Sequence, residues 1–337
     1  MKIAFLQTAH PAHDERVWEN QRASLVAAGD TVEVLSTMGN NRPADKCRTI
    51  RHFLQHSLPE IVICDTPFAV VEARLCSHAT VVWDVTEWYP SKKDLRASGL
   101  AYHVLKCIKT LLFRLAKRMA HAFIFGETDK RAPFLPTRKP GLMLPYYPRL
   151  EYVDFQPEPP LVEPCLLYAG PLTEDKGWPD VLKAFRLLQQ EIPGIRLDVI
   201  TAQSNDAPSY PGIRYLPPMP FADFCNALSR YHVMLDLRRI DEENTRCLPI
   251  KIFYYMAAGR PVVYSQLGAI RKGIPEIDEC ARLVQPDDVQ SVATAVRNYL
   301  EDSALYHKQA ARARQLALEK YNWQQLETSF TQFIHAL

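Results

Sequence analysis

The sequence lacks several features that mark whole classes of protein. Its eight cysteines are scattered, none stands in a C-x-x-C pair, and no Cys/His cluster has zinc-site spacing. No stretch of eighteen or more apolar residues exists, and the start, MKIAFLQTAH, lacks the layout of a signal peptide. These absences argue against a disulfide scaffold or a zinc module, and they predict a soluble, cytoplasmic protein with reduced cysteines.

The first loop contains no glycine. Residues 2–7 (KIAFLQ) predict a buried strand, residues 17–28 predict a helix that ends at Gly29, and residues 31–35 predict the next strand. This βαβ pattern is typical of a doubly wound α/β domain. A dinucleotide site would need G-x-G-x-x-G between the strand and the helix. A nicotinamide or flavin enzyme is therefore disfavoured.

The length of 337 residues predicts two domains, each long enough to bury a core. Between them, residues 145–164 (PYYPRLEYVDFQPEPPLVEP) are rich in proline and acid and have no periodic apolar pattern. We expect a first domain over 1–148, a linker over 149–163 and a second domain that begins at 164. A stiff linker permits a hinge and a cleft.

Charge is unevenly distributed along the chain. Residues 1–150 carry 21 Lys and Arg against 14 Asp and Glu, whereas the remainder carries 19 against 24. A basic first half indicates an anionic partner, either a membrane surface or a nucleic acid, unless the asymmetry is chance.

Residues 100–120 predict a long amphipathic helix. One face is apolar and the other is mostly basic, with Phe113 among the basic residues; the apolar set is Val104, Leu105, Ile108, Leu111, Leu112 and Leu115, and the basic set is Lys106, Lys109, Arg114, Lys117 and Arg118. A basic face with an exposed aromatic suits an anionic bilayer. The alternative is the solvated face of an ordinary core helix.

Residues 248–263 (LPIKIFYYMAAGRPVV) predict a short helix that ends at Gly259 and runs into a buried strand. The segment resembles the P-x-K-x-F-E-Y-M-A-A-G-x-P-V segment of family 4 glycosyltransferases, and the similarity recurs along nearly the whole chain. The resemblance implies the GT-B fold, in which two Rossmann-like doubly wound domains face each other across a cleft. In that family this helix, here with Lys251 and Tyr254, carries the donor-sugar site.

Two further segments resemble the family's donor-binding elements. Residues 170–177 (GPLTEDKG) resemble G-R-L-x-x-E-K-G, which implies that Gly170 and Lys176 meet the donor diphosphate, although Pro171 stands where the arginine belongs. The glycine-containing loop after the strand at residues 262–263 resembles a second donor-binding loop of the family. The residues of this loop that we expect to contact the donor are Gly268, Ala269, Ile270 and Arg271.

The family's paired glutamates, separated by seven residues, are absent. Arg246 and Tyr254 occupy their positions. Tyrosine hydrogen-bonds a ribose through its hydroxyl, and arginine binds phosphate bidentately. We therefore expect Tyr254 to bind the ribose and Arg238 or Arg246 to replace the charge lost at Pro171; Arg239 is a further candidate.

The first domain resembles the family's acceptor domain. Asp14, Arg16 and Val17 match a D-x-R-V opening, and His10 and His13 lie in the same loop. Asp14 and Arg16 fit equally well as a helix-start charge and a surface residue.

A second loop of this domain resembles D-x-H-E-x-Y-P. Asp84, Glu87, Tyr89 and Pro90 match, and Thr86 replaces the histidine. The resemblance implies that this turn faces the acceptor, so Asp84 or Glu87 is a candidate for the base that takes the hydroxyl proton. The alternative is that both carboxylates only cap the next turn.

The resemblance implies transfer of a hexosyl group from a nucleotide-diphosphate sugar to a hydroxyl of a glycan or lipid-linked glycan. Retention of configuration, no metal and no further cofactor are expected, with Lys176 stabilising the leaving diphosphate. Residues 164–320 are then the donor domain, and 321–337 a helix that packs back on the first domain. We expect a cytoplasmic protein, peripheral at the inner face of the membrane, that binds no nucleic acid.

Two alternatives remain open on the sequence. One is a catalytically inactive GT-B subunit that scaffolds an active transferase, which the missing glutamates, arginine and histidine favour. The other is a nucleotide-sugar epimerase of the same fold.

Overall fold

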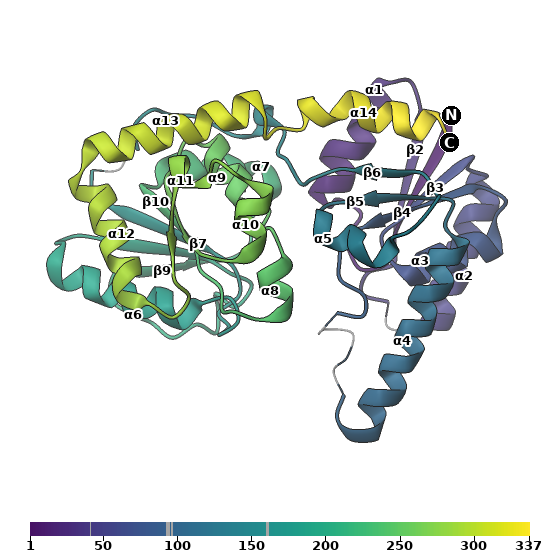
Figure 1. Cartoon of the computed structure of the whole chain (residues 1–337), viewed down its shortest axis with the longest axis horizontal. Coiled ribbons are helices and arrows are strands. Elements are labelled where there is room, and N and C mark those ends of the chain that lie inside the picture. The colour runs from purple at the N-terminus through teal and green to yellow at the C-terminus, as the bar shows by residue number, and fades with distance from the viewer. Residues whose placement is uncertain (41, 92–94, 96, 160–161) are drawn as a thin grey trace. The chain divides into compact units, whose positions relative to one another are not determined.

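The computed structural model describes residues 1–40, 42–91, 95, 97–159 and 162–337. The chain divides into two compact units (Figure 1): unit 1 contains Met1–Tyr146 and Leu326–Leu337, and unit 2 contains Tyr147–Gln325. Each unit is built around a six-stranded sheet whose paired strands all run parallel.

Unit 1 has the strand order β2-β1-β3-β4-β5-β6. Its strands are β1 Lys2–Gln7, β2 Thr31–Ser36, β3 Ile61–Cys64, β4 Thr80–Val85, β5 Ala122–Phe125 and β6 Gly141–Met143. β3 and β5 are fully buried, as expected for parallel strands covered by helices on both faces.

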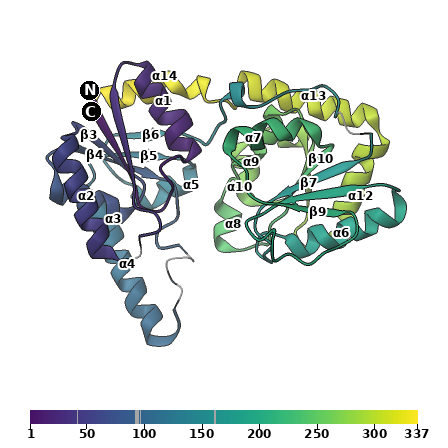
Figure 2. The ribbon, with the colours of Figure 1, turned by 180° about the vertical axis from the view of Figure 1, so that it is seen from behind.

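The helices of unit 1 cover both faces of its sheet. α2 Pro43–Ser57, α3 Pro67–Cys76 and α4 Gly99–Met119 lie side by side on one face in both views (Figures 1 and 2). A π-helical segment over Arg16–Arg22, α1 Ala23–Ala27 and α14 Gln324–His335 lie on the other. α14 is fastened there because Ser24 Oγ donates to Glu327 at 2.6 Å and the His335 ring contacts Asp30 at 2.7 Å. A short helix, α5 Thr128–Arg131, follows β5.

Unit 2 has the strand order β12-β11-β10-β7-β8-β9. Its strands are β7 Cys165–Ala169, β8 Arg196–Ile200, β9 Ile213–Leu216, β10 Val233–Asp236, β11 Val262–Ser265 and β12 Ala281–Val284. Its helices are α6 Trp178–Glu191, α7 Phe221–Ala227, α8 Glu242–Arg246, α9 Lys251–Ala257, α10 Gly268–Gly273, α11 Ile277–Cys280, α12 Val289–Glu301 and α13 Ser303–Glu319. Two apolar clusters, one on each face, form its core.

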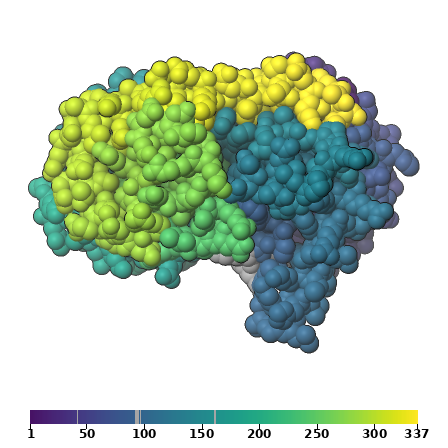
Figure 3. Space-filling model, in the orientation of Figure 1, coloured from purple at the N-terminus to yellow at the C-terminus, as the bar shows by residue number. Residues whose placement is uncertain are grey.

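The predicted helix over 100–120 forms as α4, but its faces are used differently from the prediction. Leu100, Val104, Ile108, Leu111 and Leu115 are 43–80 % exposed; we call these five residues the α4 stripe. Phe113, expected at the surface, instead packs edge-on against Trp83 and Phe134. The N-terminal turns of α4 project from the rest of unit 1 (Figures 1 and 3), and the helix therefore presents its apolar side to the surroundings. Among the described residues, no helix is both long and apolar enough to cross a bilayer.

Candidate functional site

Each sheet has one point at which the strand order reverses. In unit 1 the chain leaves β1 toward β2 and then returns to place β3 on the other side of β1. In unit 2 the chain leaves β7 toward β8 and later returns to place β10 on the other side of β7, so the reversal lies between β7 and β10. The crevice beyond the carboxyl ends of such a strand pair is where open α/β sheets bind ligands. Two candidate sites follow, one in each unit.

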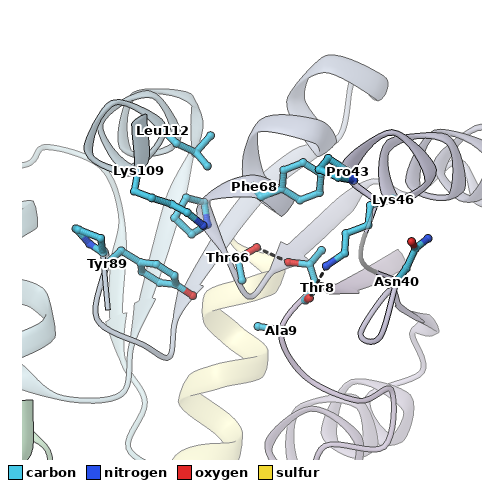
Figure 4. Close-up of a pocket in the computed structure, with 12 residues that line it drawn as sticks. Thr8, Ala9, Asn40, Pro43, Lys46, Thr66, Phe68, Tyr89, Lys109 and Leu112 are labelled. Atoms are coloured by element: carbon cyan, nitrogen blue, oxygen red, sulfur yellow. Dashed lines mark hydrogen bonds between the residues drawn. The ribbon is translucent and has the colours of Figure 1, made fainter. Parts of the chain in front are cut away.

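The unit 1 site is a pocket of about 390 Å³ at the ends of β1 and β3 (Figure 4). Thr8 directly follows β1, Thr66 is the second residue after β3, and both line the pocket. Lys46 from α2 and Lys109 from α4 reach into it from opposite sides, and Phe68 forms part of the wall. We call this cavity the switch pocket. Its lysines and threonines carry no motif, and the sequence analysis named only Lys109, as one of the basic residues of the helix over 100–120.

A buried carboxylate holds the loop beneath the switch pocket. Asp65 is 1 % exposed and accepts backbone hydrogen bonds from Thr8 at 2.8 and 2.9 Å and from Ala9 at 2.9 Å. The hydroxyls of Thr8 and Thr66 lie 2.5 Å apart. Burial raises the pKa of Asp65, and the backbone N–H groups counteract that rise. Because the carboxylate is used within the fold, it fixes the position of the two pocket threonines.

Asp84 and Arg16 do come together, but in a buried ion pair rather than in an open site. Arg16 Nε and Nη2 donate to the two carboxylate oxygens at 2.8 and 2.9 Å, and Gln21 donates at 2.7 Å. Arg16 Nη1 also donates to the carbonyl of Leu144 at 3.0 Å. Both side chains are about 4 % exposed. The charged atoms of Asp84 and Arg16 thus serve the packing of unit 1, and their roles as catalytic base and acceptor ligand stay predictions.

The other predicted acceptor residues lie around the same loops but do not line the switch pocket. His10 and Asp14 form a pair at 3.7 Å, and the His13 ring packs at a tilt of 58° against Trp18 with ring centroids 4.1 Å apart. The Thr86 carbonyl accepts from Lys130 at 2.5 Å, which holds the turn after β4, whereas Glu87 is exposed. Of the two predicted carboxylate bases, only Glu87 remains accessible.

The unit 2 site is formed by the loops that follow β7 and β10. Gly177 has φ +70°, and a Cβ there would lie 2.7 Å from the backbone carbonyl of Leu237, so only glycine fits this close approach. Asn244, 1 % exposed, donates to the carbonyls of Asp175 at 3.0 Å and of Arg239 at 3.1 Å. These contacts fasten the two loops into one cluster, which we call the switch loops of unit 2.

Positive charge gathers at the switch loops. Lys176 Nζ donates to Asn244 Oδ1 at 3.1 Å and lies 3.3 Å from Asp175, with its side chain 34 % exposed. Arg238 Nε donates to Asp236 at 3.3 Å, and Lys251 lies 3.9 Å from the same carboxylate. Burial opposes the charge on Arg238, but Asp236 outweighs it and raises its pKa. Lys176 and Lys251, both predicted from motifs, are partly accessible cations of this cluster, with side chains 34 % and 31 % exposed.

The remaining predicted donor residues divide into those near the cluster and those turned away. A Cβ at Gly268 would lie 3.4 Å from the Thr245 carbonyl, so the start of α10 abuts the end of α8, beside Arg246. Arg246 itself pairs with Glu242 at 3.3 Å. Gly170 follows β7 directly.

Four further predicted donor residues are buried or paired within unit 2. Tyr254 is 3 % exposed and packs against Phe221, so its role as a ribose ligand stays a prediction. Ala269 and Ile270 have buried side chains and Arg271 pairs with Asp278, and their donor contacts likewise stay predictions. Asn244, which binds Lys176, was missed because it belongs to no motif.

A comparison with known protein families matches a segment that lies mainly in unit 2. Residues 182–331 match the family model described as "Glycosyl transferase-like". A glycogen synthase of Mycobacterium tuberculosis is 26 % identical over 171 residues, which is 50 % of this chain and 41 % of that protein. An MMP alpha-(1->4)-mannosyltransferase of Mycolicibacterium hassiacum is 33 % identical over 69 residues, 20 % of this chain and 17 % of the relative. The chain therefore spans less than half the length of these relatives.

Solved structures match over the full length. A sucrose-phosphate synthase from Thermosynechococcus elongatus superposes with a TM-score of 0.73 at 13 % identity, covering 99 % of this chain and 98 % of the other. Anabaena Alr3699/HepE in complex with UDP-glucose superposes with a TM-score of 0.72 at 15 % identity, covering 100 % of both chains. The two parallel sheets and these matches establish the GT-B fold that the sequence predicted.

Proposed function

We propose that this GT-B protein is a glycosyltransferase that moves a hexosyl group from a nucleotide-diphosphate sugar to a hydroxyl of a glycan or lipid-linked glycan. The observation that carries the proposal is the cluster of switch loops in unit 2, where Asn244 holds Lys176 at the end of β7 and β10. The glycosyltransferase-like segment 182–331 covers much of the same unit, and one structural relative was solved with UDP-glucose.

The reaction needs positive charge more than it needs a nucleophile on the protein. The acceptor oxygen attacks the anomeric carbon of the sugar, the bond from that carbon to the diphosphate oxygen breaks, and the hydroxyl proton leaves to a base or to water. The nucleoside diphosphate departs with the bonding electrons, so a fixed cation beside it stabilises the transition state. In our proposal Lys176 supplies this charge without a metal ion, and Glu87 is the accessible carboxylate that takes the hydroxyl proton. The acceptor oxygen attacks on the face that the diphosphate leaves, so configuration is retained.

Lys176 provides a direct test. Lys176→Met keeps the aliphatic stem and removes one charged hydrogen-bond donor, which is worth about 1.5–3 kcal/mol, or about 10- to 150-fold in affinity. Calorimetry with UDP and UDP-glucose in EDTA should show that loss. Lys183→Met, at an exposed position on α6, is the matched control and should bind as the wild type does. Equal affinity in both variants would remove Lys176 from the site.

We also propose that unit 1 rests on an anionic bilayer through α4. The α4 stripe is exposed, and the same helix carries Lys106, Arg114 and Arg118 at its surface but contains no Asp or Glu. Burying a leucine in an apolar phase contributes about 1.5–3 kcal/mol, and each cation near an anionic surface about 1 kcal/mol. The acceptor would then be lipid-linked.

Vesicle co-sedimentation tests this contact. Leu111→Ser should lower partitioning onto phosphatidylglycerol vesicles about tenfold, from the lost transfer free energy. Leu75 on α3 is 68 % exposed, against 67 % for Leu111, and lies outside the stripe, so Leu75→Ser is a control of matched exposure. Equal losses in the two variants would show that exposure alone, and not the stripe, drives the association.

A catalytically inactive scaffold subunit is the second candidate. Arg246 and Tyr254 stand at the positions of the paired glutamates, and Tyr254 is buried. Incubation with a panel of UDP-, GDP-, ADP- and TDP-sugars distinguishes the two. Neither transfer nor donor hydrolysis, together with co-purification of a second transferase, would favour the scaffold.

A further inference from the structure

We infer that the switch pocket of unit 1 binds the phosphate or diphosphate group of an acceptor that also carries an apolar chain. Lys46 and Lys109 would hold the anion, and the aromatic and proline side chains of the wall would receive the apolar part. The inference rests on the proposed function, because it names the chemical class of the acceptor.

The charge in the switch pocket has one sign. Among the described residues that line it, Lys46 and Lys109 are charged and no carboxylate is present. The two ammonium groups come from separate helices, α2 and α4, and reach in from opposite sides with Thr8 and Thr66 between them (Figure 4). A neutral sugar hydroxyl gains little from two facing cations. A phosphoryl group accepts from both through charge-assisted hydrogen bonds.

Lys46 is already positioned for such a ligand. Its Nζ donates to the Thr8 carbonyl at 3.2 Å, which fixes the ammonium at the rim of the pocket. An ammonium has three donors, so two remain for an oxyanion. The hydroxyl of Thr66 and the side chain of Asn40 add polar groups on the same wall. Because the tether uses only one donor, binding an anion there costs little reorganisation.

The helices beside the pocket favour the same sign of ligand. α2 begins at Pro43 and α3 begins at Pro67, and both prolines line the cavity. The positive ends of two helix dipoles therefore point toward the pocket and add to the field of the lysines. The Asp65 carboxylate beneath the pocket accepts hydrogen bonds from the backbone N–H groups of Thr8 and Ala9, so its charge is stabilised by the loop.

The rest of the wall is apolar and leads to α4. Phe68, Tyr89 and Leu112 line the pocket, together with three prolines. Leu112 lies in α4 four residues after Ile108 and three before Leu115, so it shares a helix face with these two residues of the exposed stripe. An apolar chain attached to a phosphate in the pocket therefore has a continuous route past Leu112 onto the helix that we propose to contact the bilayer. A soluble sugar phosphate would leave this route unused.

Calorimetry with the full chain tests the assignment. The probes are farnesyl diphosphate, farnesol and inorganic diphosphate, each titrated in saturating UDP so that the cations of unit 2 are occupied. We expect farnesyl diphosphate to bind at least about tenfold more tightly than either partial probe, since each supplies only the apolar or the charged part. Inorganic diphosphate binding as tightly as farnesyl diphosphate would overturn the lipid assignment in favour of a free anion.

Variants locate the site. Lys46→Met and Lys109→Met should each weaken farnesyl diphosphate binding about tenfold or more, because each removes a charged donor. Lys46→Arg should restore it, which separates loss of charge from loss of folding. Lys183→Met is the control, because Lys183 is exposed on α6 of unit 2 and does not line the pocket. Equal affinity in the Lys46, Lys109 and Lys183 variants would overturn the inference.

The outcomes also separate this inference from the proposed function. If UDP fails to bind while farnesyl diphosphate still depends on Lys46 and Lys109, the transferase proposal falls and the pocket stands. If sugar is transferred to a neutral acceptor and farnesyl diphosphate does not bind, the transferase stands and the inference falls.

Discussion

The strongest test of how unit 1 is built is the substitution Asp84→Asn. The change keeps the size of the side chain and removes its charge, so Arg16 stays buried without a counter-charge. The three hydrogen bonds that reach Asp84, at 2.7–2.9 Å, come from Arg16 and Gln21. Removing one partner of a buried ion pair costs about 3–5 kcal/mol. In the variant, the asparagine amide would also place donors against donors.

That magnitude is large beside the stability of a domain, which is about 5–15 kcal/mol. For a domain of about 150–250 residues, 1 kcal/mol shifts Tm by about 2–4 °C, so the transition of unit 1 should fall by about 6–20 °C. Asp45→Asn is the control. Asp45 pairs with Arg48 at 3.7 Å across a surface where the arginine is 82 % exposed, and the loss should be at most about 1 kcal/mol.

Differential scanning calorimetry measures the effect, and a double variant checks its cause. Arg16→Met combined with Asp84→Leu removes both charges and should recover most of the lost Tm, since replacing a buried pair by apolar groups is often neutral. The reasoning would be refuted by an Asp84→Asn protein with wild-type Tm whose kcat loses its dependence on pH at the acid side. That result would restore Asp84 to the role of catalytic base.

Three further predictions concern individual contacts. Gly177→Ala should destabilise unit 2 by about 2–5 kcal/mol and abolish UDP binding, because left-handed strain of about 1–2 kcal/mol adds to overpacking of about 1–3 kcal/mol. Gly194 also has a positive φ, but a Cβ there would have its nearest contact at 3.6 Å. Gly194→Ala should therefore show the strain alone when thermal unfolding is measured. Hydrogen bonds from Lys320 and Tyr321 lower the pKa of Glu276 to about 2. The contribution of Glu276 to stability is therefore present above its unfolded pKa near 4.3 and is lost as pH falls toward 2. Glu276→Gln should make the urea-unfolding free energy depend less on pH between about pH 5 and 3, and an unchanged slope would contradict this. Lys139 Nζ donates to three carbonyls at the end of α4 at 2.5–3.0 Å. Lys139→Met should therefore lower the free energy of unfolding of unit 1 by about 1–3 kcal/mol, measured by urea unfolding. No loss would show that water replaces these hydrogen bonds.

Local sequence pattern was enough to predict the scaffold. The predicted strand KIAFLQ and the strand after Gly259 are the buried strands β1 and β11, and Gly29 and Gly259, predicted to end helices, adopt the left-handed conformation. These features are encoded within a few residues of where they act. The motif at Lys176 also lies where a donor diphosphate is expected in unit 2.

The contents of the two sites were harder to predict because they depend on residues far apart in the chain. Asn244 and Lys176 are hydrogen-bonded although sixty-eight positions separate them in the sequence. Lys46 and Lys109 line one pocket only because the fold brings α2 and α4 to the ends of β1 and β3. Asp84 matches a motif residue and Tyr254 stands at the position of a motif glutamate, but a motif does not report burial. Each proved to be packed in its unit.

The α4 helix shows a different limit, and it also bears on the choice between the two partners that the charge balance left open. Periodicity identified its apolar side correctly but could not say what covers it, because an apolar face reads the same whether it meets a core or a bilayer. In the structure that face is exposed beside lysines and arginines. A nucleic acid would use only the cations and leave five large aliphatic side chains in water. A bilayer with anionic lipids uses both, because apolar burial and surface charge act together on an interfacial helix. The excess positive charge of the first half of the chain therefore favours a membrane over a nucleic acid.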